Sequence, residues 1–125
     1  MSTYQRLKVW QKAMDLATEI YRLTEKLPDK ETFSLVNQTR RAAVSIPSNI
    51  AEGQDRNSTK EFVNFLSIAR GSKAELETQL QICVNVNYLT EENILQAKQL
   101  LTEIGSMLSA IISKLKNADD NHRYE

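Results

Sequence analysis

The chain has 125 residues, with 16 Lys or Arg and 16 Asp or Glu, so its formal net charge at pH 7 is zero. This length fits one domain with a single hydrophobic core, and the charge balance argues against strong non-specific binding to nucleic acid, which requires uncompensated positive charge. Residues 1–8 lack the apolar region typical of a signal peptide, and no apolar run approaches the roughly 20 residues that span a bilayer. We therefore expect a cytoplasmic protein that does not contact membranes.

Four segments show the apolar periodicity of α-helices, and none alternates as a half-buried strand would. The first ends at Pro28 and carries its inward face at spacings of three and four residues: Val9, Ala13, Leu16, Ile20, Leu23 and Leu27. A second apolar stripe runs beside it, formed by Trp10, Met14, Ala17 and Tyr21. Because one stripe suffices for an intramolecular core, the second predicts an interface with a neighbouring copy of the chain.

The second predicted helix spans residues 32–52 and contains Pro47. A proline costs roughly 3 kcal/mol inside a helix, since it removes one N–H donor and crowds the preceding turn. The sequence therefore predicts a fixed kink, with Ser45, Ser48 and Asn49 satisfying the carbonyl groups that the kink releases. We expect Gly53 to end the helix in the left-handed conformation, which glycine adopts without steric cost.

The third predicted helix begins after Ser58, because Ser58 and Glu61 match a capping box, and it continues to about Val86. Asn87 is a candidate left-handed residue after its end, and Thr90 is a candidate N-cap for the fourth helix. The inward positions of the third helix are Phe62, Phe65, Ala69, Leu76, Leu80 and Cys83, with Leu66 beside them.

The fourth predicted helix has the most regular heptad pattern, with Leu100, Met107 and Ile112 widening its apolar face. Its inward positions alternate strictly: Ile94, Ala97, Leu101, Ile104, Leu108, Ile111 and Leu115. Residues 117–125 are polar and unpatterned, so we expect a disordered tail after a single domain of residues 1–116. Short connections favour an all-α, antiparallel up-down-up-down four-helix bundle.

The second and third helices are expected to form a hairpin that turns near Asp55. This register places Ala42 and Ala43 opposite Ala69 and Gly71, which gives Gly71 a packing reason to lie inside a helix, where glycine costs roughly 1 kcal/mol. The same register brings Arg40 and Arg41 near Ser72 and Glu75. We therefore predict an ion pair between one of these arginines and Glu75.

Arg40, Arg41, Arg70 and Lys73 could form a basic surface that contacts phosphate or a partner protein. The alternative is that these groups are paired with nearby carboxylates or solvated. Ser45, Ser48 and Asn49 could likewise form a ligand site instead of compensating for Pro47.

Little in the sequence supports catalysis. Cys83 falls in an apolar helical phase, as a buried structural cysteine would, and the single histidine, His122, lies in the predicted tail. The sequence contains no metal-binding spacing of Cys and His, nucleophile elbow or phosphate-binding glycine loop. We expect a protein without enzymatic activity, cofactor or metal.

Three stretches of the chain resemble a known family of four-helix-bundle proteins, which are encoded in intervening sequences of bacterial 23S ribosomal RNA genes. The matching motifs are Leu7-Lys8-Val9-Trp10, Arg41-Ala42-Ala43-Val44-Ser45-Ile46-Pro47-Ser48-Asn49-Ile50-Ala51-Glu52-Gly53, and Phe65-Leu66-Ser67-Ile68-Ala69-Arg70-Gly71-Ser72 with Glu75-Leu76 and Gln79-Leu80. The resemblance implies a ring-like homopentamer and, by genetic context, an association with RNA or the ribosome. A related branch, the accessory proteins of diversity-generating retroelements, binds a reverse transcriptase and nucleic acid through a basic surface, which the balanced charge of this chain does not match.

Two functions from different classes follow. The first is a non-enzymatic homo-oligomeric scaffold that binds a protein or a structured RNA. The second is an accessory protein whose arginines contact nucleic-acid phosphates directly.

Overall fold

The computed structural model describes residues 4–123, with side chains described through residue 118. Within these bounds the chain forms helices and no strand, so the predicted all-α fold with four α-helices is confirmed. No described helix combines the length and apolar character needed to cross a membrane. The helices are α1 (Lys8–Thr24), α2 (Asn37–Gln54), α3 (Thr59–Asn85) and α4 (Leu95–Arg123), with short 3-10 segments η1 (Tyr4–Arg6) and η2 (Asp29–Glu31) and a π-helical segment η3 (Thr32–Val36).

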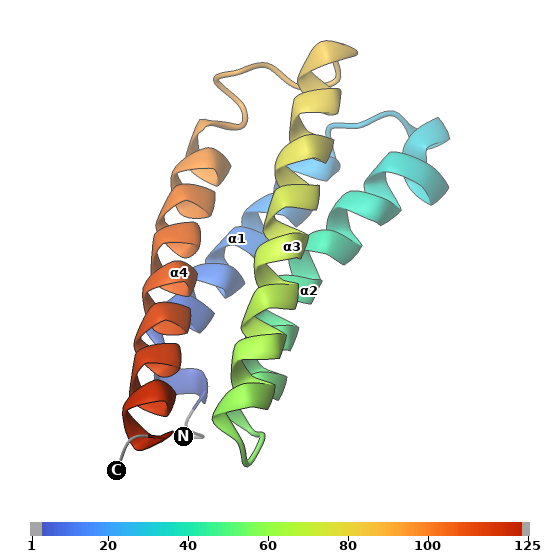
Figure 1. Ribbon diagram of the computed structural model, residues 1–125. Helices are drawn as coiled ribbons and strands as arrows, with labels where there is room; N and C mark the ends of the chain where they lie inside the picture. Colours follow the sequence, from blue (N-terminus) through green and yellow to red (C-terminus); the bar gives the residue numbers. More distant parts are fainter. Residues whose placement is uncertain (1–3, 124–125) are drawn as a thin grey trace.

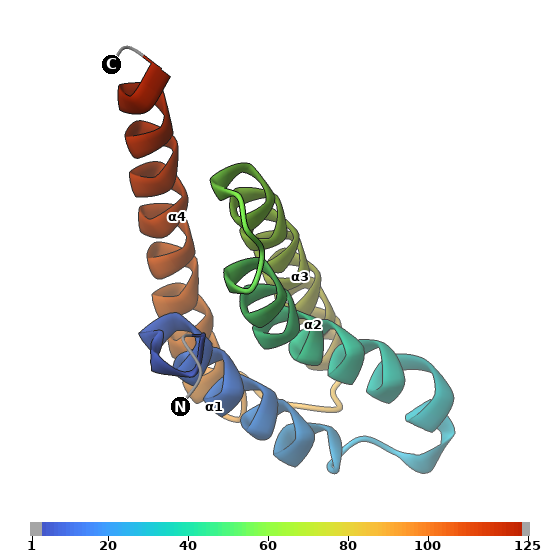
Figure 2. The ribbon, with the colours of Figure 1, turned by 90° about the horizontal axis from the view of Figure 1, so that it is seen from below.

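The four helices lie side by side, and the connections between them alternate between the two ends of the molecule (Figures 1 and 2). The most extensive packing is between α2 and α3, and α2 also packs against α1. The remaining helix, α4, packs against both α1 and α3. Thus α2 separates the exposed sides of α1 and α3, which is important for the surfaces described below.

The core follows the predicted inward faces of α1 and α4, with one shift near the end of α4. All six predicted positions of the first helical segment are buried. In α4 the pattern holds through Leu108, but the next buried residue is Ile112, while Ile111 is only partly buried. A straight α-helix has 3.6 residues per turn, so a strict seven-residue pattern drifts around its surface. The drift moves the buried stripe from Ile111 to Ile112.

In α3 the deepest residues are Leu66, Ala69, Leu76, Leu80 and Cys83, each at most 1% exposed. We had expected Leu66 to lie beside the core, and it is instead fully buried. Conversely, Phe62 and Phe65 are only partly buried, and the guanidinium of Arg56 lies over the Phe65 ring, 4.9 Å from its centre.

Gly53 is buried inside α2 and does not have a positive φ angle, so the predicted left-handed helix end was wrong. The helix continues to Gln54. A Cβ atom on Gly53 would lie 2.7 Å from Cβ of Phe65 and 3.0 Å from Cδ1 of Phe62. Glycine is therefore needed for the close approach of α2 and α3, and the backbone angles at this position do not require it.

Ser58 and Asn87 adopt the conformations predicted for the two ends of α3, and Thr90 caps the turn that precedes α4. Ser58 Oγ accepts a hydrogen bond from the Glu61 N–H at 3.1 Å. Thr90 and Asn93 exchange two side chain to backbone hydrogen bonds, of 2.9 and 3.0 Å, immediately before α4. Asn87 has a φ of 66°, the left-handed conformation that asparagine tolerates. These local signals define the α3–α4 connection.

Two boundaries differ from the predictions. The π-helical segment η3 occupies the beginning of the predicted second helix, and regular α2 starts at Asn37. The fourth helix extends to Arg123, so its end was placed too early at residue 116; residues 124 and 125 of the predicted tail lie outside the described residues. Pro47 is buried within α2, and the kink we predict there stays a prediction.

Candidate functional site

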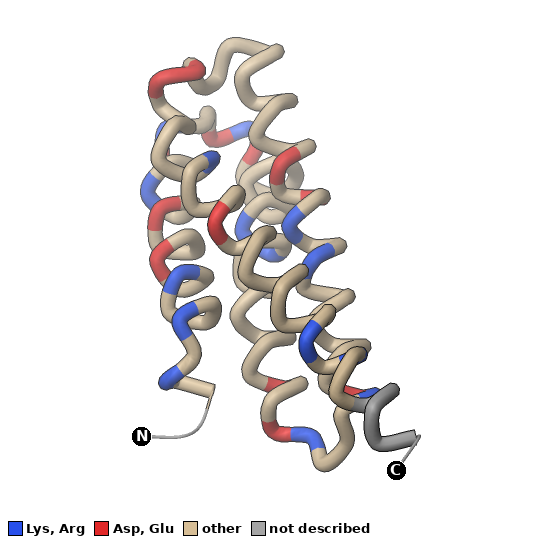
Figure 3. Tube along the Cα trace, turned by 60° about the vertical axis from the view of Figure 1, so that its left-hand side comes forward, with Lys and Arg blue, Asp and Glu red and all other residues tan. Residues whose placement is uncertain are grey.

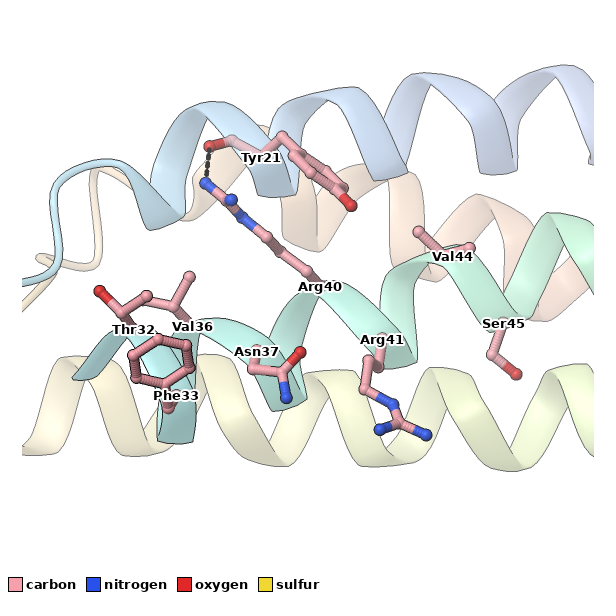
Figure 4. Close-up of a pocket in the computed structure, with 9 residues that line it drawn as sticks. All are labelled: Tyr21, Thr32, Phe33, Val36, Asn37, Arg40, Arg41, Val44 and Ser45. Atoms are coloured by element: carbon pink, nitrogen blue, oxygen red, sulfur yellow. Dashed lines mark hydrogen bonds between the residues drawn. The ribbon is translucent and has the colours of Figure 1, made fainter.

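A groove opens where the last turns of α1 meet η3 and the first turns of α2 (Figure 4). Its volume is about 660 Å³. Its wall contains two arginines and no carboxylate. The lining residues are Tyr21, Thr32, Phe33, Val36, Asn37, Arg40, Arg41, Val44 and Ser45.

Arg40 crosses this groove and joins α2 to α1. Its guanidinium lies over the ring of Tyr21, 4.4 Å from the ring centre. It also donates to Thr24 Oγ1 at 2.8 Å and to the Tyr21 carbonyl oxygen at 3.3 Å, as Figure 4 shows for the latter. Thr24 in turn donates to the Ile20 carbonyl oxygen at 2.7 Å. The Arg40 side chain therefore has a structural role: it connects α2 to the end of α1.

Arg41 has a different environment, although it is the next residue. It is exposed, extends away from Tyr21 and Arg40 in Figure 4, and forms no ion pair among the side chains of residues 4–118. The predicted arginine pair with Glu75 was wrong: Glu75 accepts a hydrogen bond from Gln79 Nε2 at 3.3 Å. The physical reason is that Arg40 points toward α1, where an aromatic face and two oxygen atoms satisfy it.

The four cations proposed as a basic surface do not form one cluster. Lys73 pairs with Glu77 at 2.8 Å and extends over Gly105 of α4, whereas Arg70 is exposed. Figure 3 shows acidic and basic residues interspersed along the helices. Of the set, Arg41 and Arg70 are the exposed cations without an ion pair among the described side chains.

The predicted apolar stripe on α1 divides into two kinds of residue. Trp10 and Ala17 are partly buried and pack against the core, and Trp10 also contacts the ring of Tyr4 edge to face. Met14 and Tyr21 remain 42% and 45% exposed. Phe33 and Val44, next to Tyr21 in the groove, are 94% and 41% exposed. We name Met14, Tyr21, Phe33 and Val44 the α1–α2 face.

A polar cluster surrounds Pro47 between α2 and α3. The hydroxyl groups of Ser45 and Ser72 are 2.8 Å apart, and Asn49 Nδ2 donates to the Ser45 carbonyl oxygen at 2.8 Å and to Ser45 Oγ at 2.9 Å. The carbonyl that Pro47 leaves without its helical N–H partner is that of Ala43, whereas Asn49 bonds the Ser45 carbonyl, so the predicted compensation for Pro47 stays a prediction. Ser48 is exposed and takes no part in the cluster. Ser72 completes the cluster from α3, and this role was not predicted.

Gly71 does not have the packing role predicted for it. It is exposed, and apart from its own turn of helix no heavy atom of the described residues lies within 4 Å of a Cβ atom placed there. The register explains the error: the bond between Ser45 and Ser72 turns Ser72 toward α2, which leaves Gly71 on the outside of α3. Ile68 and Ile82 lie on the same side and are 45% and 43% exposed. We name Ile68, Gly71, Glu75 and Ile82 the α3 outer face.

A contact that sequence reasoning missed links the end of η2 to the connection between α3 and α4. Glu31 accepts hydrogen bonds from Ser34 Oγ at 2.6 Å and from the Tyr88 hydroxyl at 2.8 Å. These hydrogen bonds, that from Ser34 first, lower the pKa of the Glu31 carboxyl. The same pairing raises the pKa of Tyr88. No local sequence motif predicts the contact between Glu31 and Tyr88, because the two residues are 57 positions apart in the chain.

Cys83 is fully buried. Burial, with a smaller contribution from the Glu31 carboxylate, raises its thiol pKa from 9.0 to about 11. A thiol that stays protonated at neutral pH is a poor nucleophile. Among the described residues no group of three or more His, Cys, Asp or Glu is arranged to hold a metal ion.

These features define a small all-α protein whose most distinctive surfaces are exposed apolar side chains and unpaired arginines. Residues 5–110 match the family model of the 23S rRNA-intervening sequence protein. The chain belongs to this family.

A solved structure shares the fold over most of its length. It is the crystal structure of a protein with unknown function from the S23 ribosomal protein family of Bacteroides thetaiotaomicron, with a TM-score of 0.77 and 30% sequence identity. The match covers 83% of this chain and 97% of that one. No curated protein matches the chain.

Proposed function

We propose that the chain is a cytoplasmic, non-enzymatic scaffold: an antiparallel up-down-up-down bundle that associates with copies of itself and presents the assembled surface to a partner. The α1–α2 face supports this proposal most directly. Exposed apolar side chains are ordinary when scattered, whereas a contiguous group marks an interaction surface. Tyr21, Phe33 and Val44 line one groove, and Met14 lies two helical turns before Tyr21 on α1.

The number of copies rests on the family resemblance. The motifs quoted above imply a pentameric ring, and an apolar face gives no count of subunits. We therefore propose a pentamer as the specific form of the assembly, with the predicted stripe of Trp10, Met14, Ala17 and Tyr21 contributing to the interface.

The test is the molar mass from light scattering coupled to size exclusion. The wild-type chain is expected to elute at a multiple of its 14.3 kDa monomer mass. Met14→Glu and Val44→Glu, each placing a charge on the α1–α2 face, are expected to lower the mass to that of the monomer and leave the helical circular dichroism unchanged. Gln99→Glu, an exposed position on α4, is the matched control and should keep the wild-type mass. A wild-type monomer at high protein concentration would refute the proposal.

The second candidate function is direct binding to structured RNA or to another nucleic acid. It is favoured by the family name, by the implied relation to retroelement accessory proteins, and by the free guanidinium groups of Arg41 and Arg70. Zero net charge argues against it, although a ring repeats each arginine in every subunit.

A salt titration separates the two candidates. If arginines contact phosphates, the affinity for a ribosomal RNA fragment falls steeply with salt, and Arg41→Ala or Arg70→Ala reduces the slope of that dependence. Gln99→Glu again serves as the control. Absence of binding at low salt would remove this function and direct the search to protein partners.

A further inference from the structure

We propose that the α3 outer face is the surface on which the α1–α2 face of a second copy docks. This inference rests on the proposed self-association and specifies which two surfaces meet. It predicts a contact between unlike faces, which generates closed rings or open filaments, and not a symmetric dimer built from one face alone.

The α3 outer face is an unpartnered side of a long helix. Its members Ile68, Gly71, Glu75 and Ile82 follow one another at helical spacings of three, four and seven residues, so they lie on the same side of α3. Two of the four are large apolar side chains with more than two fifths of their surface exposed. The apolar buried residues of α3 form the core, whereas the buried polar residues Ser72 and Gln79 border the α3 outer face.

Gly71 lies at the centre of this face. Glycine weakens a helix interior because its unfolded chain is more flexible. The close contact of Gly53 with Phe62 and Phe65 explains why a glycine is kept there, whereas among the described residues no neighbouring helix or loop comes within 4 Å of a Cβ atom placed on Gly71. A missing side chain on an exposed face, flanked by Ile68 and Ile82, permits another backbone or a large side chain to approach closely.

The charges favour the pairing of unlike faces. The groove within the α1–α2 face is lined by Arg40 and Arg41 and by no carboxylate. The α3 outer face carries the single carboxylate of Glu75, whose described partner is the neutral amide of Gln79. Two α1–α2 faces brought together would oppose arginine with arginine. Docking of unlike faces brings Arg41 toward Glu75 of the next copy.

The α2 helix lies between the two faces. Arg40 of α2 contacts α1, and Ser45 of α2 contacts Ser72 of α3. The two faces share no residue, and the proposed assembly requires that a neighbour docked on one face leave the other uncovered.

The experiment mixes two variants, each with one face damaged. Gly71→Trp blocks the α3 outer face, and Met14→Glu blocks the α1–α2 face. Each variant alone is expected to elute as a folded monomer. An equimolar mixture retains one intact pair of faces and is expected to give a heterodimer with twice the monomer mass. Gln81→Trp, at an exposed position on another side of α3, is the control and should keep the wild-type mass.

The outcomes separate this inference from the function on which it rests. If the wild type assembles and Met14→Glu dissociates it, but both Gly71→Trp and Ile68→Glu keep the wild-type mass, the α3 outer face is not the docking surface and the inference fails alone. If both variants dissociate the assembly but their mixtures with Met14→Glu stay monomeric, the pairing of unlike faces is wrong. A monomeric wild type overturns both proposals. Ile68→Glu also replaces Gly71→Trp if the tryptophan variant does not fold.

Discussion

Gly53 and Gly71 have the same helical backbone conformation but opposite surroundings. Gly53 lies in the last turns of α2 against Phe62 and Phe65, where even one methyl group is too large. Gly71 lies in the middle of α3 and faces open space. The comparison shows that glycines inside helices occur for different reasons. Packing within the chain requires glycine at position 53, whereas no packing contact within the chain requires it at position 71.

The largest effect on stability is expected for a substitution of Gly53, the packed glycine. Gly53→Ala places a Cβ atom 2.7 Å from Cβ of Phe65, which is attached to the backbone and cannot rotate away. Forced overpacking of this kind costs about 1–3 kcal/mol. We expect a decrease of several degrees in the melting temperature. An unchanged melting temperature would show that α2 and α3 can separate without cost.

The second prediction concerns Cys83, on the buried side of α3. Its thiol pKa is about 11 in the folded chain and near 9.0 when solvated. Between these values the folded state holds the proton and the unfolded state loses it. The free energy of unfolding should therefore fall by up to roughly 2 kcal/mol as the pH rises from 9 to 11.

The control places a cysteine on the exposed side of α3. Cys83→Ala should remove this contribution to the pH dependence, and adding Gly71→Cys in that background should not restore it, because an exposed thiol ionises similarly in both states. The Gly71→Cys thiol should also react rapidly with a thiol reagent at pH 8 in the monomer. Equal pH profiles for the wild type and Cys83→Ala would contradict the predicted shift.

The third prediction is an increase in stability, whereas the first is a decrease. Gly71→Ala adds a methyl group in open space and improves helix propensity, so it should stabilise the monomer by about 0.5–1 kcal/mol. Chemical denaturation should be measured at dilutions, or in the Met14→Glu background, at which the chain is monomeric. A loss of stability in the monomer would mean that Gly71 is packed within its own chain.

The smallest effect is expected at the contact between Glu31 and Tyr88. Tyr88→Phe removes one of the hydrogen bonds that lower the pKa of Glu31, so this pKa should rise toward 4.5. Glu31 contributes stability above its unfolded pKa that is lost as the pH falls through its lower folded value. The variant should therefore lose less stability on acidification, and an NMR titration of Glu31 reports the shift directly. An unchanged titration would remove Tyr88 as a cause.

The helices and their ends were largely predictable from the sequence because their signals are local. Apolar spacing identified the buried face of α1, and Ser58, Asn87 and Thr90 each act within a few residues of their own position. The shift from Ile111 to Ile112 was not predictable from a strict heptad, since it depends on the actual helical period against the neighbouring helices.

The candidate site was less predictable because it depends on how helices face one another. Counting residues across the α2–α3 turn placed Gly71 and Glu75 toward α2, whereas Ser72 is the residue that bonds there. The contacts of Arg40 with α1 were not predicted either, because they depend on which neighbouring helix the side chain faces. The exposed Phe33 and the hydrogen bond between Glu31 and Tyr88 lacked any periodic signal.

The contacts of Arg40 make the end of α1 depend on the first turns of α2. The last carbonyl groups of a helix have no partner within it, and Arg40 supplies a donor to Tyr21 O from the first turns of α2, together with a positive charge near the helix C-terminus. The last turn of α1 thus cannot fray without releasing Arg40. In native-state hydrogen exchange, the two segments should open as a single cooperative unit across the intervening loop.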